Sequence, residues 1–317
     1  MNSQKKVRIN VKGKKKTVNS AVIEGKNIII KGNFLKIARI KDELCDDGIR
    51  DPEKIVSRLK QNKNADLFTF DQKPPDYEPR FNYYFEWDNL AVLEIKSFEH
   101  WWKHQIRNDA RRMVRKAQKS NVIVKVVPFT DELVHGIKRI YDETPLRQGR
   151  RMWHYNKDFN TIKDDNSSFL ERSDFIGAYY NDELIGFEKI AYTGTRADPI
   201  QLISTIKDRD KAPTNALIAK SVEICAEKGI SHLTYGKYVY GKKGADLLND
   251  FKKRNGFQQV NLPRYYIPLT LKGRLALKLK FHRELIEILP SAVIDALLQI
   301  RAKAYSIKYS REVGGSN

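Results

Sequence analysis

Apolar and polar positions late in the chain predict a strand, a helix and a second strand in succession. Residues 199–206 are short, apolar and rich in β-branched side chains, which is typical of a buried strand, and residues 230–235 repeat this pattern. Between them, residues 214–228 place one apolar stripe along a helix: Leu217, Ile218, Val222 and Cys225. Pro213 before the helix and Gly229 after it mark the helix ends. A helix start of this kind favours an anionic ligand, although any βαβ unit also needs one.

A hairpin pattern precedes this segment. Residues 174–180 and 183–192 flank the pair Asn181-Asp182, whose side chains tolerate the positive φ of a tight turn. We therefore expect a hairpin there, with the strand at residues 199–206 pairing next to it. From residue 122 to residue 269 the predicted order is β-α-β-β-β-α-β-α-β-β, which indicates the α/β (α+β) class.

The first eighty residues show weaker patterns. Residues 1–16 hold seven cations and predict a solvated, partly frayed end. Residues 21–40 predict two short strands. Asp51 is a good helix cap and Pro52 fits the first turn, so a helix is expected over residues 51–60. Residues 71–80 contain three prolines and predict an exposed connection.

The chain is strongly basic, with 59 Lys and Arg against 39 Asp and Glu and a net charge of +20. Such a charge favours an anionic partner. Residues 98–119 predict a long helix that carries an apolar stripe and, on its other faces, six cations: Arg107, Arg111, Arg112, Arg115, Lys116 and Lys119. This surface is interpreted either as a solvated face or as a contact for a phosphate backbone.

Several classes of site are not expected. Cys45 and Cys225 belong to no metal or redox motif, and His100 and His104 lie one helical turn apart without a convincing third ligand. We therefore expect no metal site and no disulfide. The sequence shows no apolar run of membrane length and no signal peptide, which favours a soluble cytoplasmic protein.

One loop combines cationic, hydrogen-bonding and aromatic side chains. It follows a helix predicted to end near residue 143 and reads ETPLRQGRRMWHY. Ligand-binding loops carry this mixture, although a basic surface loop is the alternative. The candidate substrate-binding residues in it are Arg147, Gln148, Trp153, His154 and Tyr155.

Several short pieces resemble the GNAT acyltransferase superfamily, and more closely its FemAB-like branch of peptidoglycan aminoacyltransferases and bacterial GNAT-like proteins. They are the helix end RRMVRKAQKSNVIV, the Pro-Thr-Asn helix start, the strand end Thr234-Tyr235-Gly236, and Phe251-Lys252 followed by Gly256-Phe257. The resemblance covers about residues 111–270. It implies a GNAT-like mixed, mostly antiparallel sheet flanked by helices, in which strands 199–206 and 230–235 splay apart between donor and acceptor.

The resemblance also implies a donor site, with one departure. Where GNAT enzymes carry Q/R-x-x-G-x-G/A, this sequence has Arg209 followed by Ala212 and Thr214 in the glycine positions. Pro213 also removes an N–H, so the backbone cradle for coenzyme A is weaker. The candidate donor-binding groups are the backbone N–H groups of Thr214, Asn215 and Ala216 and the side chains of Arg209 and Lys211. The donor implied is acyl-CoA or aminoacyl-tRNA.

The same resemblance implies an acyl- or aminoacyl-transferase whose acceptor is an amine on a small molecule or peptide. A backbone N–H near Ser204 would hold the oxyanion, Glu188 would take the amine proton and Tyr238 would protonate the leaving group. Tyr235 is placed with the substrate-binding residues. Glu188 facing solvent and Tyr238 merely packing are the alternatives.

Two other interpretations stay open. A catalytically inactive GNAT-like fold could bind RNA or another polyanion, which includes tRNA. The region 271–309 predicts two helices broken at Pro290, and a stripe of Leu275, Leu279, Ile286 and Leu289 suits either packing or contact with an anionic membrane surface. The predicted division is an N-terminal lobe (residues 1–97), for which a reduced GNAT-like half is one interpretation, an acyltransferase domain (98–270) and a C-terminal helical segment packing on the lobe (271–317).

Overall fold

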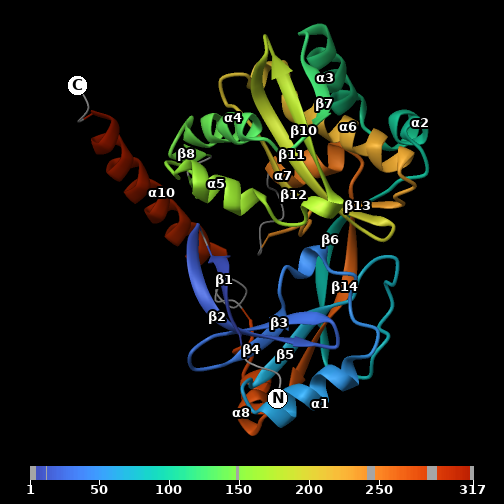
Figure 1. The fold of residues 1–317 in the computed structure, drawn as a ribbon, viewed down its shortest axis with the longest axis vertical. Coiled ribbons are helices and arrows are strands. Elements are labelled where there is room, and N and C mark those ends of the chain that lie inside the picture. The colour runs from blue at the N-terminus through green and yellow to red at the C-terminus, as the bar shows by residue number, and fades with distance from the viewer. Residues whose placement is uncertain (1–4, 12, 148–149, 241–246, 284–290, 315–317) are drawn as a thin grey trace. The chain divides into compact units, whose positions relative to one another are not determined.

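The computed structural model describes residues 5–11, 13–147, 150–240, 247–283 and 291–314, and Figure 1 shows its ribbon. It contains two compact units. The first unit comprises Met1–Ala91, Gly236–Gly241 and Gln259–Ile288, and the second comprises Val92–Tyr235, Lys242–Gln258 and Leu289–Asn317. The predicted boundaries at residues 97 and 270 stay a prediction.

The first unit contains a mostly antiparallel sheet in the order β1-β2-β3-β4-β5-β14-β6, within which only β4 and β5 are parallel among the described pairs. Its strands are β1 (Lys5–Val11), β2 (Lys14–Ile23), β3 (Lys26–Lys31), β4 (Ile37–Ile40), β5 (Leu67–Asp71), β6 (Phe85–Glu94) and β14 (Gln258–Pro268). The prediction of a frayed end was wrong, because β1 pairs along its length with β2. Val7 lies opposite Val18, and the lysines at the start of both strands conceal the strand pattern.

One face of this sheet is covered by α1 (Pro52–Asn62), and the predicted helix is confirmed. Asp51 caps it by accepting a hydrogen bond from the N–H of Glu53, and Pro52 occupies the first turn. Ile55 and Leu59 are buried in a core that contains Phe68 and Tyr265 from the sheet. The 3-10 turn η1 (Glu43–Cys45) and the helix α8 (Leu271–Lys278) complete the described elements of this unit.

The sheet of the second unit has the order β6-β13-β12-β11-β10-β7 and is antiparallel except for β12 and β13. Its strands are β7 (Ile123–Val127), β10 (Ser173–Tyr180), β11 (Glu183–Thr193), β12 (Arg196–Ser204) and β13 (His232–Thr234). The predicted hairpin is confirmed, because Asn181 and Asp182 have φ of 48° and 62° and join β10 to β11. The predicted strand 199–206 pairs with β11 as expected.

Helices cover both faces of this second sheet (Figure 1). The described helices between β6 and β14 in the chain are α2 (Phe98–His100), α3 (Asn108–Lys119), α4 (Asp131–Asp142), α5 (Phe159–Asn166), α6 (Pro213–Glu227) and α7 (Leu247–Arg254), together with the 3-10 turn η3 (Leu170–Arg172). Of these, α4 and α6 pack directly on β11. Successive residues of β11 show the two faces. Glu188 contacts Ser221 of α6, whereas Lys189 contacts the carbonyl of Asn166 at the end of α5.

Three element predictions needed correction. The helix expected over 98–119 is broken, because Trp101–Gln105 form a wide π-turn and Ile106 is extended. The helix α5 was not predicted. The two strands expected near the end of the sheet are one strand, β14, whose residues Arg264–Pro268 pair with β5 in the first unit.

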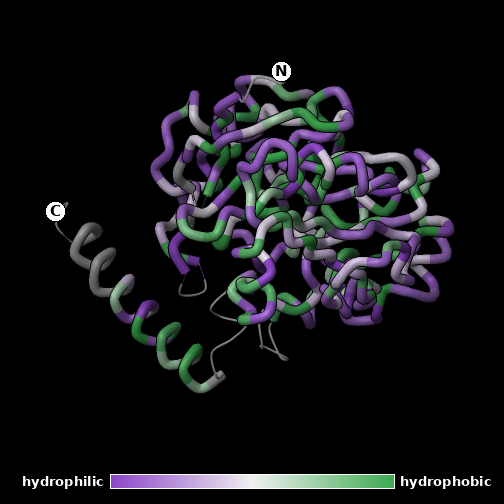
Figure 2. Tube along the Cα trace, turned by 90° about the horizontal axis from the view of Figure 1, so that it is seen from below, coloured by the Kyte–Doolittle hydropathy of each residue, from purple (hydrophilic) through white to green (hydrophobic). Residues whose placement is uncertain are grey.

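After α8 the chain continues to α10 (Ser291–Gly314), and the predicted break at Pro290 lies outside the described residues, as do Ile286 and Leu289. Figure 2 shows hydrophobic and hydrophilic positions interspersed along the trace. Within the described part of the chain, no helix is both long and apolar enough to span a membrane.

Candidate functional site

The parallel strands β12 and β13 form a fork. Their register joins only Arg196 to His232 and Ala197 to Leu233, and in the described chain no strand pairs with this edge of β12 beyond Ala197. On the other edge, the β11–β12 register shifts so that Ile200 is an extra residue. The predicted splay is therefore present. Because backbone groups of a strand point alternately to its two sides, N–H and C=O groups of β12 face the open fork.

A buried ion pair lies where the strands separate. Arg196 donates to the carboxylate of Asp198 at 3.1 and 3.2 Å, and the hydroxyl of Thr234 donates to the same carboxylate at 2.6 Å. Asp198 is fully buried. The ion pair lies within β12, and the hydrogen bond from Thr234 links its carboxylate to β13 where the two strands stop pairing. The sequence analysis did not single out these residues, although an Arg and an Asp two positions apart begin the strand segment RADPIQLIS.

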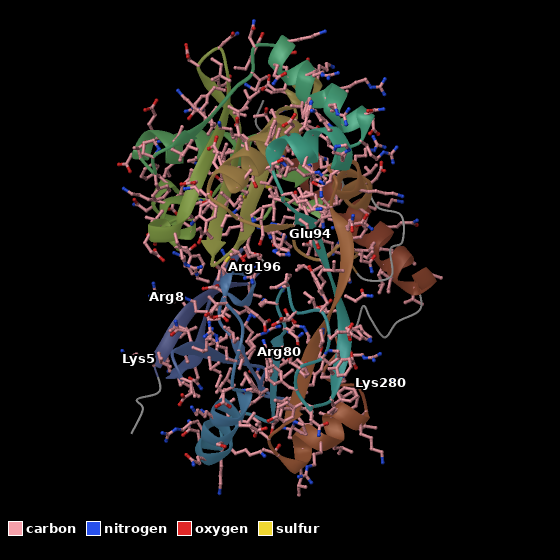
Figure 3. The ribbon with its side chains drawn as sticks, turned by 90° about the vertical axis from the view of Figure 1, so that its right-hand side faces the viewer. Lys5, Arg8, Arg80, Glu94, Arg196 and Lys280 are labelled. Carbon is pink, nitrogen blue, oxygen red and sulfur yellow. The ribbon has the colours of Figure 1, made fainter. Side chains whose placement is uncertain are left out.

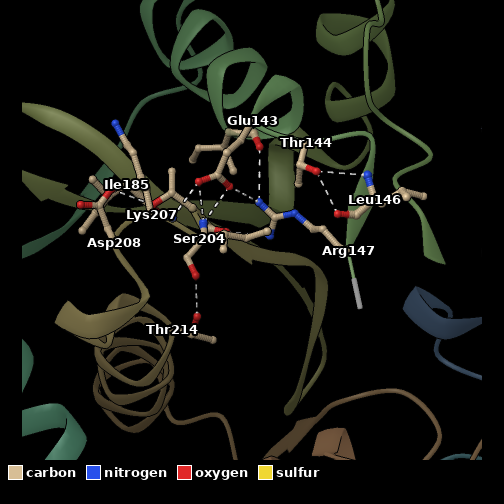
Figure 4. A network of polar contacts seen from close by, with 12 residues as sticks. Glu143, Thr144, Leu146, Arg147, Ile185, Ser204, Lys207, Asp208 and Thr214 are labelled. Carbon is tan, nitrogen blue, oxygen red and sulfur yellow. Dashed lines mark hydrogen bonds and ion pairs between the residues drawn. The ribbon is translucent and has the colours of Figure 1, made fainter. Parts of the chain in front are cut away.

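The far end of β12 is held by Glu143 and Arg147 (Figure 4). The carboxylate of Glu143 accepts hydrogen bonds from the N–H groups of Ile206 and Lys207 at 2.7 and 2.8 Å. Arg147 donates to Glu143 at 3.0 Å and to the carbonyl of Ser204 at 2.7 Å. Arg147, a predicted substrate contact, is therefore bound to the backbone at the strand end.

Most backbone N–H groups in the loop between β12 and α6 already donate hydrogen bonds within the protein. Glu143 takes two of its N–H groups, and Ile185 and loop carbonyls take others, so six N–H donors are occupied: Thr205, Ile206, Lys207, Arg209, Lys211 and Ala212. Residues Arg209–Lys211 form a 3-10 turn, η4. The Lys211 ammonium pairs with Asp208 at 3.2 Å and with Asp210 at 3.4 Å. Arg209 is exposed.

The first turn of α6 is the remaining part of the predicted donor site. Thr214, Asn215 and Ala216 occupy it, and the Thr214 hydroxyl lies 2.8 Å from the Ser204 hydroxyl. The amide of Ala216 bonds back to the carbonyl of Ala212 at 3.4 Å. The side chain of Ser204 thus reaches the start of α6, and its backbone pairs with Gly186 of β11. A Cβ at Gly186 would meet that of Ser204 at 3.0 Å.

Glu188 is fully buried between β11 and α6. The Ser221 hydroxyl donates to one carboxyl oxygen at 2.5 Å, and the other oxygen has no hydrogen-bond partner among the described residues. Burial raises the pKa of Glu188 to about 8, and the Ser221 bond opposes that shift only in part. Glu188 is therefore mostly protonated at neutral pH. Its role as the base stays a prediction and requires loss of a proton that burial holds in place.

Tyr235 directly follows β13 and faces a buried lysine. Its ring lies 5.7 Å from that of Phe257, and the Lys252 ammonium lies 5.1 Å from its centre. Lys252, on α7, is 1 % exposed. One turn further, Asn255 contacts Asn215 at the start of α6 at 3.5 Å. A lysine thus lies at the end of the fork. The sequence analysis named Lys252 only as part of the Phe251-Lys252 motif and gave it no role.

The loop expected to bind substrate separates into two parts. His154 stacks on Tyr141 at 4.4 Å, and burial lowers its pKa to about 4, so it is a neutral packing residue at pH 7. Tyr155 packs against the same core. Trp153 is 42 % exposed beside Arg151, next to the short strands β8 (Leu146–Arg147) and β9 (Arg150–Arg151).

Three predicted groups remain. Gln148 lies outside the described residues. Tyr238 belongs to the first unit, and its role as the acid stays a prediction. Among the described residues, no group of three or more His, Cys, Asp or Glu could hold a metal, and the His100 and His104 rings lie 5.1 Å apart.

No family model and no curated protein matches the sequence. Solved structures do match the fold. FemX is 11% identical with a TM-score of 0.53 and covers 87% of this chain and 90% of its own. The L-PGS from Bacillus licheniformis is 14% identical with a TM-score of 0.56, covering 82% of this chain and 88% of its own. The C-terminal domain of a putative lysylphosphatidylglycerol synthetase from Agrobacterium fabrum is 15% identical with a TM-score of 0.55, covering 82% and 87%.

These likenesses extend well beyond the residues that carried the sequence resemblance, because they cover more than four fifths of the chain. At such low identity they concern the fold. The chain has a GNAT-like, FemAB-like fold with a large, mostly antiparallel sheet.

Proposed function

We propose that the second unit transfers an acyl or aminoacyl group from an activated carrier to an amine on a small molecule or peptide. The fork between β12 and β13 is the observation that carries this proposal. Its open edge offers backbone N–H groups in fixed positions, which suits a carbonyl whose oxygen becomes negative during attack. Fold likeness to FemX and to the two synthetase structures agrees with this class of chemistry.

Aminoacyl-tRNA fits the site better than acyl-CoA does. The pyrophosphate of coenzyme A needs several free backbone N–H groups, and six of those in the loop are already occupied. Thr214, Asn215 and the exposed Arg209 remain for a phosphate. A donor with many contacts elsewhere depends less on this loop. The FemAB-like branch that the sequence resembles uses aminoacyl-tRNA.

In the reaction the amine attacks the ester carbonyl, a C–N bond forms, and the C–O bond to the carrier breaks. The amine loses a proton, and the departing oxygen gains one. We assign to Lys252 the stabilisation of the negative carbonyl oxygen, together with backbone N–H groups of β12, because a buried cation favours developing negative charge. Glu188 remains the candidate for accepting the amine proton.

The test is product formation. Mass spectrometry should show an acylated amine when the protein is incubated with charged tRNA and a mixture of amines. Lys252→Ala should reduce the rate about a hundredfold, whereas Lys253→Ala, its exposed neighbour, should not. Absence of product with every carrier would overturn the proposal.

Arg209 tests the donor. Loss of a charge-assisted phosphate contact should weaken tRNA binding roughly ten- to a hundredfold in Arg209→Ala. Lys207→Ala is the matched control, since Lys207 pairs with Glu183 at 2.9 Å. Calorimetry that finds tight acetyl-CoA binding, unaffected by Arg209→Ala, would contradict the choice of donor.

A second candidate function is binding of RNA without turnover. It is favoured by α3, where Arg112, Arg115, Lys116 and Lys119 are exposed along one helix. Tight tRNA binding without any product would support it against the transferase.

A further inference from the structure

In the first unit, α8 displays leucines to solvent. Leu271 is 80%, Leu275 58% and Leu279 50% exposed. At about 100° per residue these three positions lie within about 80° of one another on the helix. Phe281, which is 60% exposed, follows Leu279 closely in the chain. Phe34, which is 77% exposed, lies beside the helix, because the Lys272 ammonium is 4.3 Å from its ring. We call these five residues the α8 surface.

The orientation of α8 is fixed by its opposite side. A Cβ at Gly273 would meet the carbonyl oxygen of Asp66 at 1.9 Å, so the helix approaches the backbone more closely than any other residue allows. Thr270 caps the helix by accepting from the N–H of Gly273 and donating to Asp66, both at 3.0 Å. Gly273 and Ala276 are buried. The leucines therefore point outward as a consequence of how the helix is attached.

Cations flank this apolar stripe. Residues 271–283 contain five Lys or Arg and no Asp or Glu: Lys272, Arg274, Lys278, Lys280 and Arg283. Lys272 pairs with Asp66 and Arg283 with Glu86, whereas Arg274, Lys278 and Lys280 form no ion pair with any described residue. Lys280 is exposed just after the helix (Figure 3). Three positive charges thus surround exposed leucines.

We propose that the α8 surface binds an anionic lipid bilayer. Its leucines and phenylalanines would lie in the headgroup region, and the flanking cations would contact lipid phosphates. Leucine beside Lys and Arg is the composition of helices that lie in a membrane interface. Charge complementarity selects this occupant. A second copy of the chain would bring the same unpaired cations against one another, and a nucleic acid would leave the leucines without an apolar partner. The proposal does not depend on the transfer reaction.

Co-sedimentation with vesicles tests the proposal. The intact chain should bind vesicles of phosphatidylcholine mixed with phosphatidylglycerol, bind phosphatidylcholine alone much more weakly, and release as salt rises. The variant Leu271→Ser, Leu275→Ser, Leu279→Ser should bind at least about tenfold more weakly, because apolar burial in the interface is lost. A matched control replaces exposed residues elsewhere: Ile123→Ser, Leu170→Ser and Leu247→Ser. It should bind as the intact chain does.

Two further variants keep the test decisive if the serine variant unfolds. Arg274→Ala, Lys278→Ala, Lys280→Ala should weaken binding to anionic vesicles on the order of a hundredfold. Phe34→Trp should add fluorescence to that of the four native tryptophans, and brominated lipids should quench this variant more than the intact chain, which reports insertion of this surface itself. Equal vesicle binding by all variants, or absence of this additional quenching, would overturn the proposal. So would a dimer that the leucine substitutions dissociate, because the surface would then be an interface between copies.

Discussion

At the scale of single residues, three buried ionisable side chains of the second unit have different partners. Asp198 has a guanidinium and a hydroxyl. Lys189 has the carbonyls of Asn166 and Ser168. Glu188 has one hydroxyl, and its other oxygen lacks a partner among the described residues. Buried charge is stable only when it is paired or hydrogen-bonded, so Glu188 is the residue expected to hold its proton.

Glu188 predicts a pH dependence of stability. Its pKa is about 8 in the folded chain against 4.5 for the ordinary side chain, so between these values the folded state binds a proton that the unfolded state releases. The free energy of unfolding should therefore fall as pH rises, by at most about 1.4 kcal/mol per pH unit. Glu188→Gln should remove this slope. Urea unfolding of both proteins across pH 4.5 to 8 measures it, and identical slopes would show that Glu188 does not carry the shift.

The pair Arg196 and Asp198 predicts a loss of stability on single substitution that a double substitution largely reverses. Asp198→Ala should cost about 3 to 5 kcal/mol of stability, because it leaves the Arg196 guanidinium buried without its carboxylate. Replacing both, as Arg196→Met with Asp198→Leu, should recover most of that loss. Chemical unfolding of the single and double variants gives the comparison. A double variant as unstable as Asp198→Ala would mean that the unpaired guanidinium does not cause the loss of stability.

At the scale of elements, the end of β12 is defined by contacts with the segment after α4. Glu143 and Arg147 lie four residues apart in the chain and together bind the N–H groups of Ile206 and Lys207 and the carbonyl of Ser204. No local pattern in the sequence pairs residue 143 with residue 206. The sequence therefore placed Arg147 in a ligand loop, whereas the structure gives it a backbone partner 57 residues away.

The Glu143 contacts predict how backbone N–H groups of the loop between β12 and α6 can be made available to an anion. Glu143→Ala frees the N–H groups of Ile206 and Lys207 and leaves the Arg147 cation nearby, so binding of inorganic pyrophosphate should strengthen about tenfold. Isothermal calorimetry measures that affinity. Glu183→Ala, which removes a more exposed carboxylate that pairs with Lys207, is the control and should change it little. Unchanged or weaker pyrophosphate binding in Glu143→Ala would show that the carboxylate does not occupy an anion site.

At the scale of the whole molecule, local patterns predicted elements better than they predicted partners. The hairpin at Asn181 and Asp182, the helix after Asp51 and the βαβ segment around α6 depend on turn residues, caps and apolar stripes that neighbours in sequence supply. The assignment of β14 depends instead on pairing between Arg264 and Asp71. The break in the helix at Ile106 likewise depends on Trp101, which is held by the distant carbonyl of Asn255. Such long-range contacts leave no local signature.

The strong positive charge of the chain is distributed over distinct surfaces, and two of them predict separable ligands. On α3, Arg112, Lys116 and Lys119 are exposed, while Arg111 already donates to the carbonyls of Lys103 and Ile106. Arg112→Ala, Lys116→Ala, Lys119→Ala should therefore weaken tRNA binding and reduce its salt dependence, because fewer phosphate contacts release fewer counterions. The same variant should bind anionic vesicles normally, since its α8 surface is intact.

The reciprocal variant completes the comparison. Arg274→Ala, Lys278→Ala, Lys280→Ala should lose vesicle binding and keep tRNA affinity and its salt slope, because this variant retains the exposed cations of α3 that are expected to contact the tRNA phosphates. Filter binding at several salt concentrations and vesicle sedimentation measure the two affinities on the same preparations. Both variants carry three fewer positive charges, so general electrostatic attraction is equal between them. If each lost both ligands to the same extent, net charge alone would govern binding, and neither surface would have a specific role.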